Sequence, residues 1–381
     1  MATVAIGVSG EGRGHGARAR ALAEALRDEG HRVLIAAPGD AHAMLEPVFR
    51  GDPAISVRWI PGLRFHYRPD QRLDPVGTAA GAIPYLWRLK ELTRRLAVWL
   101  EREGVDMVIA DFEPALPRAA RSVGIPFVSV DHQNFLTACD LSHLPRGLRA
   151  HLAYMRPVVE MFTRGQAASV VSSFFFPPLR DTHSHVHQVG VLMRRELLAA
   201  DPTREGHLTG YFRRFVPPGA LRALEGCGRP VRVYGVGERE ACGPGGRVTF
   251  HATSQGPFLA DLASCDALVC TAGNQLVGEA MFLGKPVLAV AERGNHEQRM
   301  NAWFLRAGGG GDWAEAEAFD GGTVGTFLER LDAHRAALRP DLMNGLPRTL
   351  EVLRRQLRAT GAPAAAAAPA TPARPAVLLT R

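Results

Sequence analysis

Residues 270–305, CTAGNQLVGEAMFLGKPVLAVAERGNHEQRMNAWFL, contain a strand-to-helix corner of the kind that binds phosphate groups. A short apolar run ends in CTAG, and a helical pattern begins near Asn274, directly after Gly273. Glycine lets backbone amides approach a ligand closely, and the free N–H groups at a helix start carry the positive end of its dipole. The corner therefore suits a phosphate or a diphosphate.

Polar side chains surround this corner. Glu279 lies on the second turn of the same helix, where a carboxylate would repel a phosphate but can accept hydrogen bonds from a ribose diol. Gln298 and Asn301 lie one turn apart on the next helix and share a face, and their amides suit sugar hydroxyls. The alternative for each residue alone is a solvated position or a helix cap. Their combined spacing indicates a binding site.

A second corner that could do chemistry lies near the N-terminus. The run GVSGEGRGHGARARALAEAL ends a strand in a glycine loop and starts a helix at His15. It fails as a dinucleotide fingerprint, because His15 stands in place of the third glycine and no acidic residue ends the second strand. At neutral pH an imidazole can accept the proton of an attacking hydroxyl group.

A carboxylate on the far ring nitrogen of His15 would fix its tautomer and stabilise the imidazolium. Asp111 ends the run VDMVIAD and is the first choice for this partner, with Glu113 in reserve. Three alternatives stay open. His15 could bond only its own loop or a phosphate, Asp111 could cap a helix, and His132, after the run IPFVSVD, could be the base instead.

Short β-rich runs alternate with helical patterns along the chain, and these elements must position the two corners. Near-continuous apolar strands with helices between them predict parallel sheets covered on both faces. Ligands bind such sheets at the carboxyl ends of the strands. The predicted strands are VAIGVS, RVLIAA, ISVRWI, VDMVIAD, IPFVSVD, ASVVSS, HLTGYFRR, RPVRVYGVG, RVTFHA, DALVCTA and KPVLAVA.

The strand–helix rhythm restarts after about residue 185, which predicts an α/β chain of two Rossmann-like, doubly wound domains. We expect an N-terminal domain over residues 1–185, a C-terminal domain over 186–345 and a helix over 346–358. The run HVHQVGVLMRRELLAADPTREG is expected to connect the domains. Residues 359–381, rich in Ala and Pro, cannot bury enough apolar surface to become ordered, so we predict a disordered tail.

Charge and cysteine content argue against several classes of function. The formal charge of +7 comes with no basic run interleaved with aromatic residues, so we expect no nucleic-acid partner. Five cysteines without a CxxC pair indicate reduced, cytoplasmic thiols rather than disulfides or a zinc site. We find neither a signal peptide nor an apolar run of about 18 residues. The cluster HSHVH at 183–187 lacks an ordered carboxylate partner, so we expect no metal site.

The segment TAGNQLVGEAMFLGKPVLAVAERGNHEQRMNA resembles the donor-binding signature of nucleotide-sugar glycosyltransferases with the GT-B fold. These include the UDP-glycosyltransferases, the bacterial transferase that adds GlcNAc to the lipid-linked peptidoglycan precursor, and bacterial and archaeal members with a TAGxQLxxEA…EQxxNA core. The resemblance implies a donor on the C-terminal domain and an acceptor on the N-terminal domain, with a cleft between them. It implies that Gly273 and Asn274 contact the diphosphate, that Glu279 contacts the ribose and that Gln298 contacts the sugar. We also expect donor contacts from Gly12, Gly14, Arg213, Thr271 and Gln275.

The resemblance also implies that His15 is the general base and that Asp111 orients it. One departure concerns Thr271, because many relatives with small-molecule acceptors carry a His at this position. Thr271 offers only a hydroxyl, so the helix amides must carry more of the phosphate charge. Arg213 and Arg214 could help by bidentate contact. The acceptor pocket is expected to include His66, Trp87 and His132.

These features predict an enzyme that transfers a sugar from a nucleotide-diphosphate sugar to a hydroxyl or amine of a small molecule, such as a specialised metabolite. Inversion follows from the resemblance and from a plausible base. Neither a cofactor nor a metal is expected, since no Asp-x-Asp pair is present. The alternatives are a UDP-sugar 2-epimerase, a transferase for a lipid-linked saccharide at a membrane face and a non-catalytic nucleotide-sugar binding protein. The broken glycine pattern argues against an NAD oxidoreductase.

Overall fold

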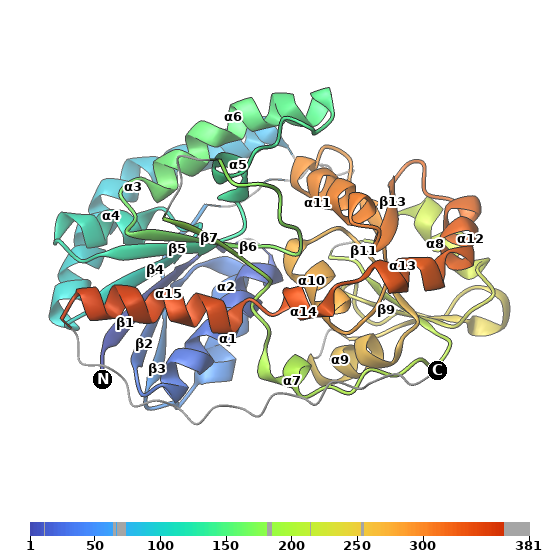
Figure 1. Ribbon diagram of the computed structural model, residues 1–381, viewed down its shortest axis with the longest axis horizontal. Helices are drawn as coiled ribbons and strands as arrows, with labels where there is room; N and C mark the ends of the chain where they lie inside the picture. The colour runs from blue at the N-terminus through green and yellow to red at the C-terminus, as the bar shows by residue number, and fades with distance from the viewer. Residues whose placement is uncertain are drawn as a thin grey trace.

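The computed structural model describes residues 1–10, 12–63, 66, 74–180, 185–213, 215–252 and 255–361. Arg214, most of the predicted C-terminal tail and part of the HSHVH cluster lie outside these residues. Two parallel sheets form the centres of two α/β domains that lie side by side (Figure 1). This arrangement confirms the predicted fold class.

The first sheet has seven strands in the order β3-β2-β1-β4-β5-β6-β7, all paired in parallel. Val8 at the end of β1 is the register partner of Asp111 at the end of β4. The glycine loop after β1 therefore begins beside Asp111. The strands are β1 (Thr3–Val8), β2 (Arg32–Ala37), β3 (Ile55–Trp59), β4 (Met107–Asp111), β5 (Phe127–Asp131), β6 (Ala168–Ser172) and β7 (Val186–Val189).

The second sheet has six parallel strands in the order β10-β9-β8-β11-β12-β13. Its strand order reverses between β8 and β11, as the order of the first sheet does between β1 and β4, and ligands bind doubly wound sheets at such switch points. The strands are β8 (Leu208–Tyr211), β9 (Val231–Tyr234), β10 (Val248–Phe250), β11 (Ala267–Cys270), β12 (Val287–Ala291) and β13 (Gly311–Glu315).

Helices cover both sheets, because central strands such as β4 and β12 are buried along their whole length and almost entirely apolar. The first domain contains α1 (Arg13–Asp28), α2 (Gly39–Phe49), α3 (Pro75–Arg102), α4 (Ala115–Ser122), α5 (Phe135–Ala138) and α6 (Arg146–Thr163). The helices that follow are α7 (Arg195–Leu198), α8 (Pro218–Glu225), α9 (Gln255–Ser264), α10 (Asn274–Phe282), α11 (His296–Ala307), α12 (Gly321–Glu329), α13 (Leu331–Ala337), α14 (Pro340–Met343) and α15 (Leu346–Ala359). Among the described helices, none has the length and apolarity needed to cross a bilayer.

The chain crosses between the domains twice. The first sheet continues through β7, so it extends beyond the predicted boundary at residue 185, and the second sheet begins only at Leu208. After the second domain, α15 returns to pack on β6, β7 and α1 (Figure 1, red). Strands β7 and β13 were not predicted. The first is a short edge strand inside the expected connection, and the second follows a run of four glycines and carries charged residues.

Candidate active site

The N-termini of α1 and α10 meet where the two domains face each other. Each helix follows a glycine, Gly12 at φ 82° and Gly273, and neither start has a side-chain cap or an acidic residue in its first turn. The two starts are close, since a Cβ atom built on Gly14 would lie 3.5 Å from the Cβ of Gln275. In contrast, Asn295 caps α11 in the usual way. Two helix dipoles thus direct their positive ends into one region.

Arginines from both domains add positive charge to this region. Arg13 occupies the first turn of α1, an unfavourable place for a cation unless an anion is bound nearby. Arg213, two residues after β8, ion-pairs with Asp40 at 3.0 Å and lies beside Gly12. Burial raises the pKa of Tyr211, and the charges of Arg13 and Arg213 act against this rise. The arrangement could hold a diphosphate.

His15, Asp111 and Arg18 form a connected group at the carboxyl end of the first sheet. His15 Nδ1 lies 2.9 Å from Asp111 Oδ1, and the His15 side chain is 15% exposed. Arg18, one turn later on α1, donates from Nε to Asp111 Oδ2 at 3.0 Å and from Nη2 to Oδ1 at 2.6 Å. Burial alone would raise the pKa of Asp111, but Arg18 and His15 outweigh burial and lower it. An ionised Asp111 suits the tautomer of His15 with a proton on Nδ1 and a free lone pair on Nε2.

Two further carboxyl groups lie near His15 and Arg18. Burial raises the pKa of Asp131 to about 7, and the charge of Asp111 adds to this rise. Glu297, in the first turn of α11, is exposed at the domain interface, but the surrounding protein desolvates its carboxyl and raises the pKa. The charges of His15 and Arg18 act against that rise. Glu297 therefore places a carboxyl from the second domain close to the His15 ring.

Three of the predicted donor residues bond to protein groups instead of facing an open space. Asn274 donates to Ser172 O and accepts from Phe174 N at the end of β6. Gln275 donates to Leu192 O and to Glu279 Oε1. Glu279 is buried and also accepts from Arg194, at 3.3 Å from Nε and 2.9 Å from Nη2. A ribose would have to displace one of these partners to reach the Glu279 carboxylate.

The remaining predicted donor residues lie close to the interface. Thr271 is almost fully buried after β11, and Gly273 is exposed at the start of α10. The Gln298 amide bonds to the backbone N–H and the carboxylate of Glu292, which ties α11 to the end of β12. The Asn301 amide, expected to suit sugar hydroxyls, donates to Ala272 O instead, which ties α11 to the loop after β11.

The predicted acceptor residues do not form one pocket. His132 is fully buried, its Nε2 lies 3.0 Å from Asn301 Oδ1, and burial lowers its pKa to about 3. This places it out of reach of an acceptor, so it is a poor alternative base. Trp87 is 83% exposed on α3, and His66 lies against the start of the same helix. Glu113 caps α4 through two backbone N–H groups and does not contact His15.

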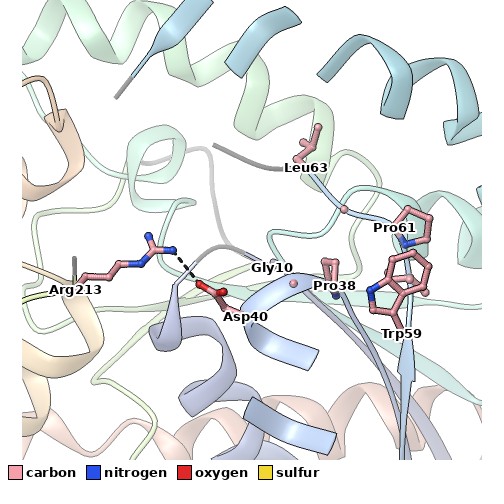
Figure 2. Close-up of a pocket in the computed structure, with 10 residues that line it drawn as sticks. Gly10, Pro38, Asp40, Trp59, Pro61, Leu63 and Arg213 are labelled. Carbon is pink, nitrogen blue, oxygen red and sulfur yellow. Dashed lines mark hydrogen bonds and ion pairs between the residues drawn. The ribbon is translucent and has the colours of Figure 1, made fainter. Parts of the chain in front are cut away.

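A pocket of about 470 Å³ lies at the carboxyl ends of β1, β2 and β3. Trp59, Pro61 and Leu63 line one side, and the Asp40–Arg213 ion pair lies across from them (Figure 2). Its floor includes Gly10, in the loop that leads to His15. This pocket is the described cavity best placed for an acceptor. Over the described residues, no group of three or more His, Cys, Asp or Glu side chains could hold a metal ion.

Comparison with known proteins decides the family. The model of glycosyl transferase family 1 matches residues 2–332. The chain belongs to this family. The glycosyltransferase also shares its fold with solved GT-B structures, which confirms the resemblance seen in the sequence.

Three solved structures illustrate the likeness. LpCGTa in complex with UDP has a TM-score of 0.66 at 18% identity, and the match covers 94% of the glycosyltransferase and 99% of LpCGTa. CalG4, the calicheamicin glycosyltransferase, gives 0.61 at 16% identity over 94% and 98% of the two chains. MurG of Acinetobacter baumannii gives 0.57 at 16% identity over 93% and 100%. No curated protein matched in sequence.

Three residues of the site were not predicted. Arg13 and Arg18 lie in the arginine-rich start of α1, where a single sequence gives no reason to separate them from surface arginines. Glu297 had a usable signal, because it precedes Gln298 at a helix start. The charged residues around His15 could therefore be predicted from the sequence only in part.

Proposed function

We propose that this glycosyltransferase moves a sugar from a nucleoside-diphosphate sugar to a hydroxyl group of a small molecule, with inversion and with His15 as the base. The convergence of two uncapped helix starts with Arg13 and Arg213, beside the His15–Asp111 pair, carries this proposal. UDP in the LpCGTa complex supports the donor class, and the fold shared with CalG4, the calicheamicin glycosyltransferase, supports a natural-product acceptor.

The proposed reaction needs a proton acceptor on one side of the sugar and a stabilised leaving group on the other. His15 Nε2 takes the proton as the acceptor oxygen bonds to the anomeric carbon. The bond from that carbon to the phosphate oxygen breaks, and the nucleoside diphosphate leaves with the electron pair. Backbone N–H groups at the starts of α1 and α10, with Arg13 and Arg213, stabilise the added negative charge. Asp111 stabilises the imidazolium.

His15→Ala tests the base. We expect turnover to fall by roughly two to four decades, the usual contribution of a general base, while UDP affinity stays unchanged. Release of UDP from UDP-glucose, with and without 4-methylumbelliferone as acceptor, measures turnover, and calorimetric titration measures UDP binding. His42→Ala on α2 is the control for loss of an imidazole elsewhere in the first domain.

Three outcomes would count against the proposal. Near-normal turnover in His15→Ala would exclude His15 as the base. UDP release that does not depend on any acceptor would favour an epimerase-like or hydrolytic reaction over transfer. UDP binding without turnover under any condition would favour a non-catalytic binding protein.

A further inference from the structure

Arg18 is a buried cation that contacts the Asp111 carboxylate, the same group that lies beside His15. Its side chain is 4% exposed, and it donates to both oxygens of Asp111. Its Nη2 lies 3.1 Å from His15 Nδ1. We propose that Arg18 is a positioning residue. It keeps Asp111 ionised and directed at His15, and its own positive charge disfavours the protonated, positively charged form of the His15 ring. This inference rests on the proposed role of His15.

The hydrogen-bond geometry gives Arg18 control over the tautomer of His15. Asp111 Oδ1 accepts from Arg18 Nη2 and also lies 2.9 Å from His15 Nδ1, so two donors share one oxygen. A protonated Nδ1 donates to this oxygen at 2.9 Å, whereas a bare Nδ1 would face it with a lone pair and could accept only from Arg18 Nη2 at 3.1 Å. The shorter contact with the ionised carboxylate favours a proton on Nδ1. Because the bidentate contact of Arg18 fixes the carboxylate plane, it also fixes the direction in which Nε2 points.

Arg18 also separates the roles of two neighbouring carboxyl groups. Asp111 and Asp131 are both buried, and like charges this close disfavour double ionisation. Arg18 contacts Asp111, whose pKa falls despite burial, whereas burial raises the pKa of Asp131 to about 7. The ionised member is thus the one that faces His15. Such a division marks acid–base sites in many enzymes.

The charge around His15 is consistent with this role. The groups that face it are Arg18 on its own helix, Asp111 from β4, Asp131 from β5 and Glu297 from α11. Arg18 is the permanent cation among them. Its positive charge compensates the negative charge of Asp111, so the His15 ring lies beside a neutral ion pair rather than beside an uncompensated carboxylate.

A purely structural ion pair would not require this placement. Buried ion pairs add little to stability compared with well-packed apolar residues, so stability alone does not explain a buried arginine. Arg20, two residues later on α1, pairs with Glu24 and Glu196 and lies away from Asp111. It provides a matched control on the same helix.

Nuclear magnetic resonance of the full-length protein with ¹⁵N-labelled histidine tests the inference without an acceptor. Loss of a signal in His15→Gln identifies the His15 ring. In the wild type at pH 7.5 we expect a neutral ring with the proton on Nδ1. In Arg18→Met the ring should gain its second proton at a pH at least about one unit higher, since a cation a few ångströms away is lost.

Further variants keep the test decisive if Arg18→Met does not fold. Arg18→Gln can still donate to Asp111 but lacks the charge, so it should show the same shift. Arg18→Lys keeps the charge and should titrate near the wild type, and so should Arg20→Met. A wild-type titration of His15 in both Arg18→Met and Arg18→Gln would overturn the inference.

Turnover of UDP-glucose with 4-methylumbelliferone separates this inference from the proposed function. Arg18→Met should lower kcat by roughly a hundredfold in the wild-type background, as expected for a misplaced reacting group, and should cause no further loss in His15→Ala. An equal loss in both backgrounds would contradict action through His15. If His15→Ala is itself fully active, the proposed base is wrong, and the ring titration still decides whether Arg18 controls His15.

Discussion

Asp131 and His132 are consecutive at the end of β5, and burial acts on them in opposite directions. In an unfolded chain an Asp carboxyl ionises near pH 4, whereas folded Asp131 keeps its proton to about pH 7. Asp131 therefore lowers the free energy of unfolding as pH rises through this window. Unfolded His protonates near pH 6.5, whereas folded His132 stays neutral to about pH 3. His132 therefore lowers the free energy of unfolding as pH falls through that window, and the two effects partly cancel.

Asp131→Asn removes one side of this balance. We expect its free energy of unfolding, relative to the wild type, to rise by about 2 kcal/mol between pH 5 and pH 7, because the wild type alone carries the cost of Asp131. Urea unfolding at both pH values measures the change. The exposed Asp201→Asn should show no such trend. A difference between Asp131→Asn and wild type that stays constant with pH would contradict the assignment.

At this scale the sequence predicted the His15–Asp111 contact but not Arg18. The contact was expected from the resemblance to GT-B glycosyltransferases, and the pairing of β1 with β4 brings the two residues together. Arg18 could not be recognised, because an arginine on a helix is usually solvated and only the packing of α1 shows that this one is buried.

Helix α10 uses several of its predicted donor side chains for contacts within the protein. Its side chains at 274, 275 and 279 bond to β6 and to the connection between the domains. Gly278 lies against Val191, with no room for a Cβ atom. The helix is therefore fixed in place, while its backbone N–H groups stay available for a ligand. The sequence showed the helix and its start correctly, but not which partners its polar side chains would take.

Glu279→Ala distinguishes a structural from a ribose-binding carboxylate. We expect the free energy of unfolding to fall by about 3–5 kcal/mol, because Arg194 is left buried without its partner. The double variant Arg194→Met/Glu279→Met should recover most of the loss. Urea unfolding and UDP titration are measured together. Unchanged stability with weakened UDP binding in Glu279→Ala would instead support a ribose contact.

Among the described residues, the two domains contact each other at two places discussed here. Near α6 and α11, the rings of Phe175 and Phe304 stack at 3.9 Å between centroids, and those of His151 and His296 stack at 4.3 Å. The starts of α1 and α10 meet at the other place. The strand–helix rhythm predicted two domains, but contacts between segments far apart in the chain depend on tertiary packing that periodicity does not encode.

A crystal structure of the glycosyltransferase with UDP tests the central claim most directly. We predict that the diphosphate accepts hydrogen bonds from backbone N–H groups at the start of α10 and contacts Arg13 or Arg213. We also predict that His15 Nε2 faces the space beside the terminal phosphate. A nucleotide bound away from the starts of α1 and α10, or a His15 ring turned out of the interface, would contradict the account.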